Sequence, residues 1–139
     1  MTAAEFDALL NTLPNGLHDA ELRSIAVDFA AATVTCVIHV DHSDPEVADS
    51  EGRTRTAQLV FHEVSNVTID PPGLPPDRLR PAWLVDAGSG HPTGAPRPEV
   101  SAPDGGFLAW MYLESLEGFV RIGARAASLA WIGGVVGPP

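Results

Sequence analysis

The sequence contains no lysine, so all eight basic residues are arginine, and they stand against 18 acidic residues. The formal net charge of −10 argues against nucleic-acid binding, because such proteins need a basic surface that displaces the counterions of the phosphates. It argues equally against an anionic membrane surface. A cationic protein partner is compatible with this charge, since opposite charges steer two proteins together.

Cysteine is nearly absent. The single Cys36 lies within an alternating apolar stretch, so the chain cannot form an internal disulfide, and we expect this residue to be a small buried apolar group. No apolar run approaches the length of a membrane span, and the N-terminus lacks the basic and apolar regions of a secretory leader. These absences predict a cytoplasmic protein.

The length of 139 residues and the apolar fraction of 45% are typical of one domain with its own core. A core of this size needs neither a disulfide nor a structural metal, and no cofactor is predicted. We therefore treat residues 1–139 as a single domain and expect the tail at 133–139 to be frayed.

The N-terminal residues carry the pattern of a short amphipathic helix. Thr2 and Glu5 have the spacing of a capping box. Apolar residues then recur at helical spacing, namely Phe6, Leu9, Leu10 and Leu13. Because Pro14-Asn15-Gly16 ends this pattern, the helix is too short to be stable alone and must pack on another element.

From residue 20 the apolar period changes to two, which is typical of strands. Residues 20–41 predict an antiparallel hairpin, and the wrong parity of Leu22 relative to Ile25 predicts a β-bulge between them. Residues 57–69 predict a long extended segment with a bend near His62.

Proline and glycine concentrate between Pro71 and Gly106 and predict loops there, around one short strand at 82–87. Residues 107–113 are apolar on both faces, as in a central strand that is covered on both sides. Two closing strands are expected at 118–124 and 126–132. The alternative for the end of the chain is an alanine-rich helix over 124–132.

Together these elements predict an α+β fold, mainly β, in which the N-terminal helix packs on one antiparallel sheet of about six or seven strands. No helices are expected between the strands, which excludes the doubly wound and barrel forms of the α/β class.

The densest polar cluster is Leu17-His18-Asp19-Ala20-Glu21, where the first strand begins. An imidazole and two carboxylates this close suit metal binding or acid/base chemistry. In an extended chain Asp19 and Glu21 would share one face and His18 the other, so they would form only part of a site. The alternative is structural, because polar side chains after a glycine turn satisfy backbone groups where a strand starts.

A weaker metal candidate is the run that contains His39, Asp41 and His42. His39 and Asp41 would share the polar face of a strand, and His42 follows in the loop. In a chain this acidic such a run is more often a solvated strand end, so no metal is predicted.

Trp110 and Tyr112 form a candidate binding surface. Their parity is opposite to that of Phe107 and Met111, so one face of the strand would present both aromatic side chains. An exposed pair of this kind would bind a partner or a second copy of the chain. The alternative is that both rings complete the core.

The motif Leu17-His18-Asp19-Ala20-Glu21, followed by an alternating strand, resembles small bacterial proteins of unknown function that open with a hydrophobic-His-Asp-Ala signature. Some of these proteins are grouped with the immunity proteins of polymorphic toxin systems. The segments 59–64, 83–86 and 127–131 are also similar to that group. The resemblance implies a small α+β protein, with toxin neutralisation as one candidate activity.

Three functions follow from these observations, in descending order. The first is a non-enzymatic protein-binding module for a basic partner, such as an immunity-type inhibitor. The second is a structural or oligomeric module, such as a homodimer, without a small-molecule site. The third is a small metal-dependent or acid/base enzyme that uses His18 and Asp19.

Overall fold

The computed structural model describes residues 1–41, 53–70, 82–92, 100–114 and 117–136. In these residues the chain forms one helix and nine strands. They are α1 (Ala3–Leu10), β1 (Pro14–Leu17), β2 (Glu21–Asp28), β3 (Thr33–Asp41), β4 (Thr54–His62), β5 (Asn66–Asp70), β6 (Ala82–Ser89), β7 (Phe107–Leu113), β8 (Gly118–Ala124) and β9 (Ala126–Val136). A mainly β, antiparallel fold with an N-terminal helix is therefore confirmed.

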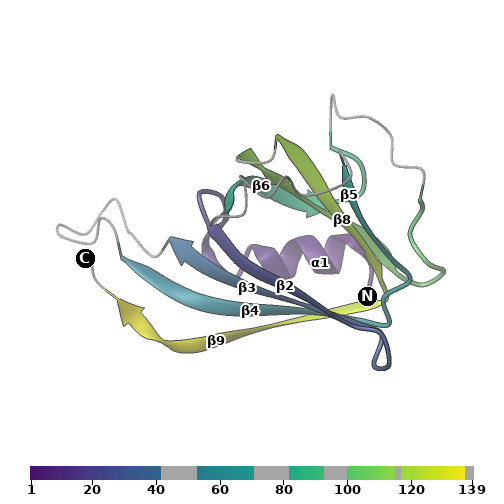
Figure 1. Ribbon diagram of the computed structural model, residues 1–139, viewed down its shortest axis with the longest axis horizontal. Helices are drawn as coiled ribbons and strands as arrows, with labels where there is room; N and C mark the ends of the chain where they lie inside the picture. The colour runs from purple at the N-terminus through teal and green to yellow at the C-terminus, as the bar shows by residue number, and fades with distance from the viewer. Residues whose placement is uncertain (42–52, 71–81, 93–99, 115–116, 137–139) are drawn as a thin grey trace.

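Eight of these strands form two antiparallel sheets of four, in the orders β2-β3-β4-β9 and β5-β8-β7-β6 (Figure 1). Two residue pairs, Glu21–Trp83 and Leu22–Ala82, join the sheets through β2 and β6. The prediction of one sheet with six or seven strands was wrong. Periodicity reveals which residues alternate, but it does not reveal where a sheet divides.

The sheets are also joined at a corner, where two neighbouring segments pass from one sheet to the other. The β4–β5 segment and the β8–β9 segment lie side by side there: Arg125 N–H donates to the His62 carbonyl (3.2 Å), and Ser65 N–H donates to the Gly123 carbonyl (2.9 Å). The predicted bend near His62 is confirmed, since Glu63 has a φ of 50°.

The end of the chain is a strand, so the alternative of a helix over 124–132 was wrong. β9 pairs with β4 over most of its length, and its alternate residues Leu129 and Trp131 lie opposite Leu59 and Ala57. The apolar face of β4 therefore outweighs the helical propensity of the alanines. β9 continues to Val136, beyond the predicted end at Ile132.

The helix α1 lies between the two sheets (Figure 1). Its predicted capping box is present, with Glu5 N–H donating to Thr2 Oγ1 at 3.2 Å. Phe6 stacks on Phe107 of β7 with ring centroids 4.6 Å apart, and its ring lies 5.7 Å from that of Phe61 in β4. One helical side chain therefore connects both sheets in the core.

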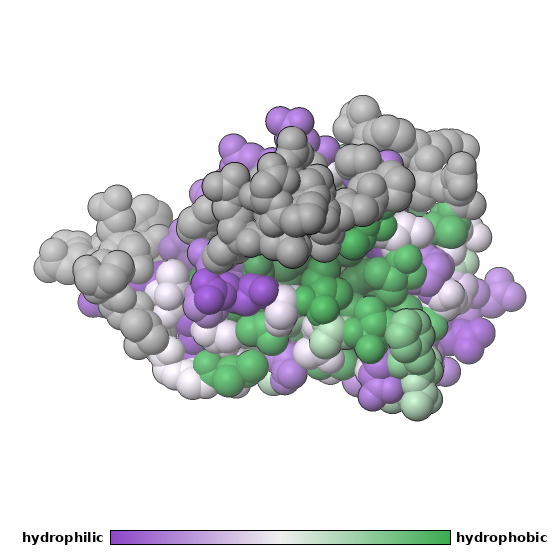
Figure 2. Space-filling view, in the orientation of Figure 1, coloured by the Kyte–Doolittle hydropathy of each residue, from purple (hydrophilic) through white to green (hydrophobic). Residues whose placement is uncertain are grey.

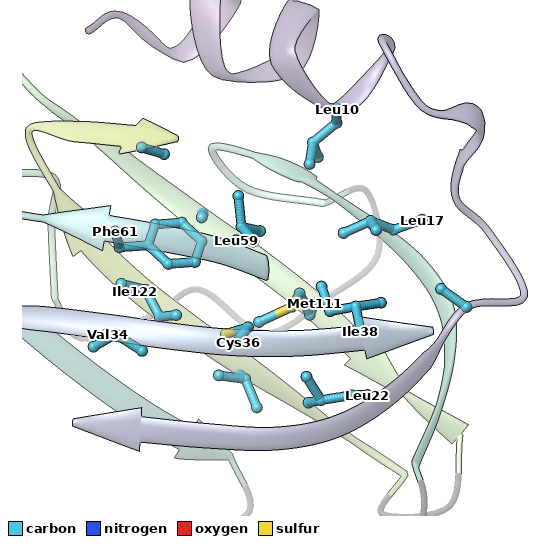
Figure 3. Packing of buried hydrophobic residues seen from close by; sticks show 14 of the residues in the cluster. Leu10, Leu17, Leu22, Val34, Cys36, Ile38, Leu59, Phe61, Met111 and Ile122 are labelled. Carbon is cyan, nitrogen blue, oxygen red and sulfur yellow. The ribbon is translucent and has the colours of Figure 1, made fainter. Parts of the chain in front are cut away.

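The hairpin of β2 and β3 supplies much of the remaining core. Alternate residues of β3 are fully buried, and the predicted bulge is confirmed as a register shift between Leu22 and Ser24. Figure 3 shows Leu22 in the same cluster as Ile38 and Met111. Cys36 is buried here, and burial raises the pKa of its thiol to about 12, so the thiol is protonated and unreactive in the folded protein.

Candidate functional site

The segment Leu17–Glu21 forms a turn between β1 and β2. His18 N–H donates to the Asn15 carbonyl and Ala20 N–H donates to the Leu17 carbonyl, both at 3.2 Å. Asp19 has a φ of 57°, the left-handed conformation that Asp tolerates better than most residues. The prediction that Asp19 and Glu21 project from one face of an extended strand was therefore wrong.

The polar side chains of this turn point away from the core. His18 Nε2 lies 3.6 Å from Asp19 Oδ2, and the two side chains are 64% and 71% exposed. Glu21 instead forms an ion pair with Arg23. The buried residues of the turn are Leu17 and Ala20, and Figure 3 shows Leu17 directed toward the core cluster. The geometry therefore joins His18 to Asp19 and leaves Glu21 in a separate pair.

The second polar candidate lies on the outer face of the first sheet. His39 and Asp41 alternate with the buried residues of β3 and are partly exposed, and His39 lies opposite Glu21 of β2. His42 lies outside the described residues. Within the ranges that the structure describes, no three His, Cys, Asp or Glu side chains gather into a group that could hold a metal ion.

Trp110 and Tyr112 lie on the outer face of the second sheet, as their parity predicted, but they are only partly exposed. Their rings pack against Phe119 of β8, with centroids 6.1 and 5.0 Å from it. The indole N–H of Trp110 donates to the Ser89 carbonyl at 3.3 Å. Both rings therefore belong to an aromatic cluster of this face.

Arg121 lies beside that cluster and was missed by the sequence reasoning. Its side chain is 2% exposed, although β8 places it on the outer face, opposite Trp110. The guanidinium lies over the ring of Phe119 at 4.8 Å, and one of its nitrogens is 3.5 Å from Asp70 Oδ2. A buried arginine between the Phe119 ring and the Asp70 carboxylate stabilises this face by cation–π and charge interactions. Its alternation within β8 was the only sequence signal.

A groove of about 390 Å³ opens where the β2–β3 turn meets the corner between β4 and β5. Its apolar lining comes from both regions: Val27, Phe29, Ala32, Val64 and Val67. In Figure 2 hydrophobic side chains gather on this part of the surface, where β2 comes next to β5. Phe29 is 92% exposed and Val27 is 45% exposed.

Two hydrogen bonds fix the backbone of the two regions that line the groove. Val64 N–H donates to the Ala32 carbonyl at 2.9 Å, which ties the corner to the β2–β3 turn. Asp28 Oδ1 accepts a hydrogen bond from Ala31 N–H at 2.9 Å and so closes that turn. These contacts hold the apolar side chains in place around the opening without filling it.

In the sequence Ile25, Val27 and Phe29 alternate with Ala26 and Asp28, as in one face of the first strand of the predicted hairpin. Val27 does lie opposite the buried Val34, on the core side of the sheet. However, the core ends before this point, so Val27 is half-exposed and Phe29 extends beyond the strand into the turn. The signal for an exposed apolar group was the position of Phe29 next to the Ala30-Ala31-Ala32 turn.

Comparison of the chain with models of protein families, with curated proteins and with solved structures finds no match. In the described part of the chain, no helix has the length and apolar character needed to cross a membrane.

Proposed function

We propose that this protein is a protein-binding module and that its groove at the β2–β3 turn receives an apolar side chain of the partner. The observation that carries the proposal is the near-complete exposure of Phe29 beside an apolar opening. An aromatic ring in water adds nothing to hydrophobic stabilisation of the fold, whereas the same ring is a typical anchor of a protein interface. Exposed apolar patches next to polar residues commonly mark such interfaces.

Charge supports a basic partner. Asp28 lines the groove, and Glu63 beside its corner is paired with Arg125 at 3.6 Å, so Asp28 supplies the local negative charge. The whole chain carries a net charge of −10, so it attracts cationic proteins from a distance. A basic protein that presents one apolar side chain between arginines or lysines fits this surface. An immunity-type inhibitor, which binds a toxin directly, is a module of this kind.

The test is site-specific crosslinking in the cells that produce the protein. A photoreactive phenylalanine analogue replaces Phe29 in one sample and Ile132 of β9, another exposed apolar residue, in a control sample. We expect a basic protein to crosslink at position 29 and not at position 132. The absence of any crosslink specific to position 29 would refute the proposed binding surface.

The crosslinked protein is then purified, and its affinity is measured by calorimetry at several salt concentrations. We expect Phe29→Ser to weaken binding by about thirtyfold, the usual loss for an aromatic anchor. Affinity should also fall as salt rises, since the attraction is partly electrostatic. An affinity that does not change with Phe29→Ser would contradict the proposal, even if the two proteins bind each other.

The second candidate, an oligomeric module, is favoured by one observation. β9 lies at the edge of the first sheet, and its Ile132 is 46% exposed. The exposed His18–Asp19 pair, by contrast, lies on a turn whose backbone role is already clear, and we propose no catalytic function for it.

A further inference from the structure

β9 is an unusual edge strand. Among the described residues it pairs only with β4, so its other side offers backbone groups to a further strand. Over its 11 residues, Ala126–Val136, it contains no charged residue and no proline. Edge strands of soluble proteins usually carry such residues, because a long uncharged edge pairs with other strands.

The opposite edge of the fold shows the usual protection. β5 has only five residues, Asn66–Asp70, and pairs with β8 alone in the described ranges. It ends in the charged Asp70, and Pro71 and Pro72 follow in the sequence. Short length, charge and proline all discourage pairing, so β5 is protected against pairing with a further strand. β9 has none of these features.

We propose that β9 pairs antiparallel with β9 of a second copy across a twofold axis, so that the two first sheets become one continuous sheet. A strand that pairs with itself forms a closed dimer, which is the commonest form of oligomer. The second copy is the occupant that fits best because β9 itself carries no charge, and the cation that lies against it is Arg55 of β4, 4.5 Å over the Trp131 ring and hydrogen-bonded to the Gly133 carbonyl at 3.0 Å. An unrelated basic strand would gain no charge complementarity there.

The part of β9 that pairs regularly with β4 gives the expected register between the β9 strands of the two copies. Regular pairing with β4 covers Ala126–Ile132, and after Ile132 the register shifts around Gly133, which has a φ of 76°. The midpoint of the regular part is Leu129, which would lie on the twofold axis. Ala127 of one copy would then lie opposite Trp131 of the other, and Ala126 opposite Ile132. Each large side chain meets a small one, which favours close packing between strands.

The test uses the solvent-facing residues of the edge. Ser128 and Ala130 are exposed, and in this register Ser128 of one copy faces Ala130 of the other. A variant with both S128K and A130K places two pairs of like charges across the axis, and a variant with S128E and A130E does the same with the opposite sign. Each variant alone should be monomeric, because like charges face each other.

Light scattering after size exclusion, over about a hundredfold range of concentration, measures the mass of each protein, since dimers dissociate on dilution. The natural chain should reach twice its 14.6 kDa mass. Each double variant should bind itself at least about a hundredfold more weakly. An equal mixture of both variants should recover dimers, seen as the mixed mass by native mass spectrometry, because opposite charges then face each other.

Two controls separate this interface from a change in folding. Thr35→Lys with Gln58→Lys adds the same charge to the same outer face, but on interior strands, and should leave the dimer intact. Ser128 also contacts His62 Nε2 at 3.0 Å, so Ser128→Ala shows whether loss of that contact matters. Within residues 126–132, the amides that point away from β4 should exchange slowly in the natural chain and fast in each variant alone, whereas those paired with β4 should stay protected in all of them.

The proposal is overturned if the natural chain is monomeric at every concentration, or if the mixture of oppositely charged variants remains monomeric. A dimer that tolerates both double variants would also overturn it, since another surface would then form the contact. These outcomes are independent of the partner proposed for the groove. Phe29→Ser should leave the dimer unchanged, and the β9 variants should still crosslink at position 29.

Discussion

The two ends of β2 differ in what they expose. At the start of the strand, the exposed residues are polar, and the apolar Leu17, Ala20 and Leu22 are buried beneath them. At the far end, the large apolar side chains of Val27 and Phe29 are exposed together with Asp28, beside an open groove. The start of β2 therefore has polar groups outside and apolar groups inside, whereas the far end also exposes large apolar side chains.

This difference separates residues that serve the fold from residues available for binding. His18 and Asp19 carry side chains that are common in catalytic and metal sites. Their backbone, however, forms the turn that leads into β2. Phe29 has no reactive group, but its exposure does not help the fold. An exposed polar residue needs no explanation, whereas an exposed aromatic one beside a groove does.

The largest effect on stability is expected at the buried start of the strand. Leu22→Ala removes a side chain that is 6% exposed and leaves a cavity between the sheets, next to the two residue pairs that join β2 to β6. We expect a loss of about 2–4 kcal/mol in the free energy of unfolding, measured with urea. A loss below about 1 kcal/mol would contradict the burial of this end.

The middle of β2 gives the second prediction, through Cys36, which lies opposite Ile25. Burial raises the pKa of this thiol from 9.0 to about 12. The unfolded chain therefore releases the proton at lower pH than the folded one. The contribution of the protonated thiol to the free energy of unfolding is complete below pH 9. It is lost as the pH rises toward 12, so the free energy of unfolding falls by up to about 1.4 kcal/mol per pH unit.

Unfolding free energies measured between pH 8 and 12 test this slope, in the natural chain and in a Cys36→Ala variant. The chain has no lysine, so few other groups titrate in this range. The variant should be less stable at pH 8, because a buried side chain is shortened, but its stability should fall less steeply. Equal slopes in both proteins would show that the thiol is not shielded from water.

Local patterns in the sequence predicted the elements well, because each depends on neighbouring residues. Thr2 and Glu5 predicted the helix start, and the parity of Leu22 predicted the bulge. The division into two sheets could not be predicted in this way. It depends on the corner at Glu63, and the two sheets meet again at pairs such as Glu21–Trp83, which join residues far apart in the sequence.

The candidate site was harder to predict for the same reason. The alternation of Ile25 and Val27 correctly indicates a strand face, but only the packing of α1 and the second sheet determines where that face stops being covered. Arg121 shows the opposite case, since an arginine in a strand is usually exposed and here it is buried. In both cases burial depends on contacts between distant elements, which local periodicity does not contain.

A smaller effect is expected at the turn before β2. Asp19 adopts a left-handed conformation, which a β-branched residue strongly disfavours. Asp19→Val should cost about 1–2 kcal/mol of unfolding free energy, whereas Asp19→Gly should be nearly neutral because glycine accepts this conformation freely. His18→Ala, which keeps the backbone unchanged, serves as the control. Equal effects of the valine and glycine variants would show that the carboxylate, not the backbone, matters here.

The smallest effect on stability is expected at the far end, and it tests the comparison most directly. Phe29 is 92% exposed, so Phe29→Ser should change the unfolding free energy by less than about 0.5 kcal/mol, although it removes a whole aromatic ring. The same variant should weaken partner binding about thirtyfold. If Phe29→Ser instead destabilised the fold as much as Leu22→Ala, the ring would be buried in solution and the groove would be closed. A residue that affects binding strongly and stability hardly at all belongs to the partner's interface, and the two ends of β2 would then differ in function as they differ in exposure.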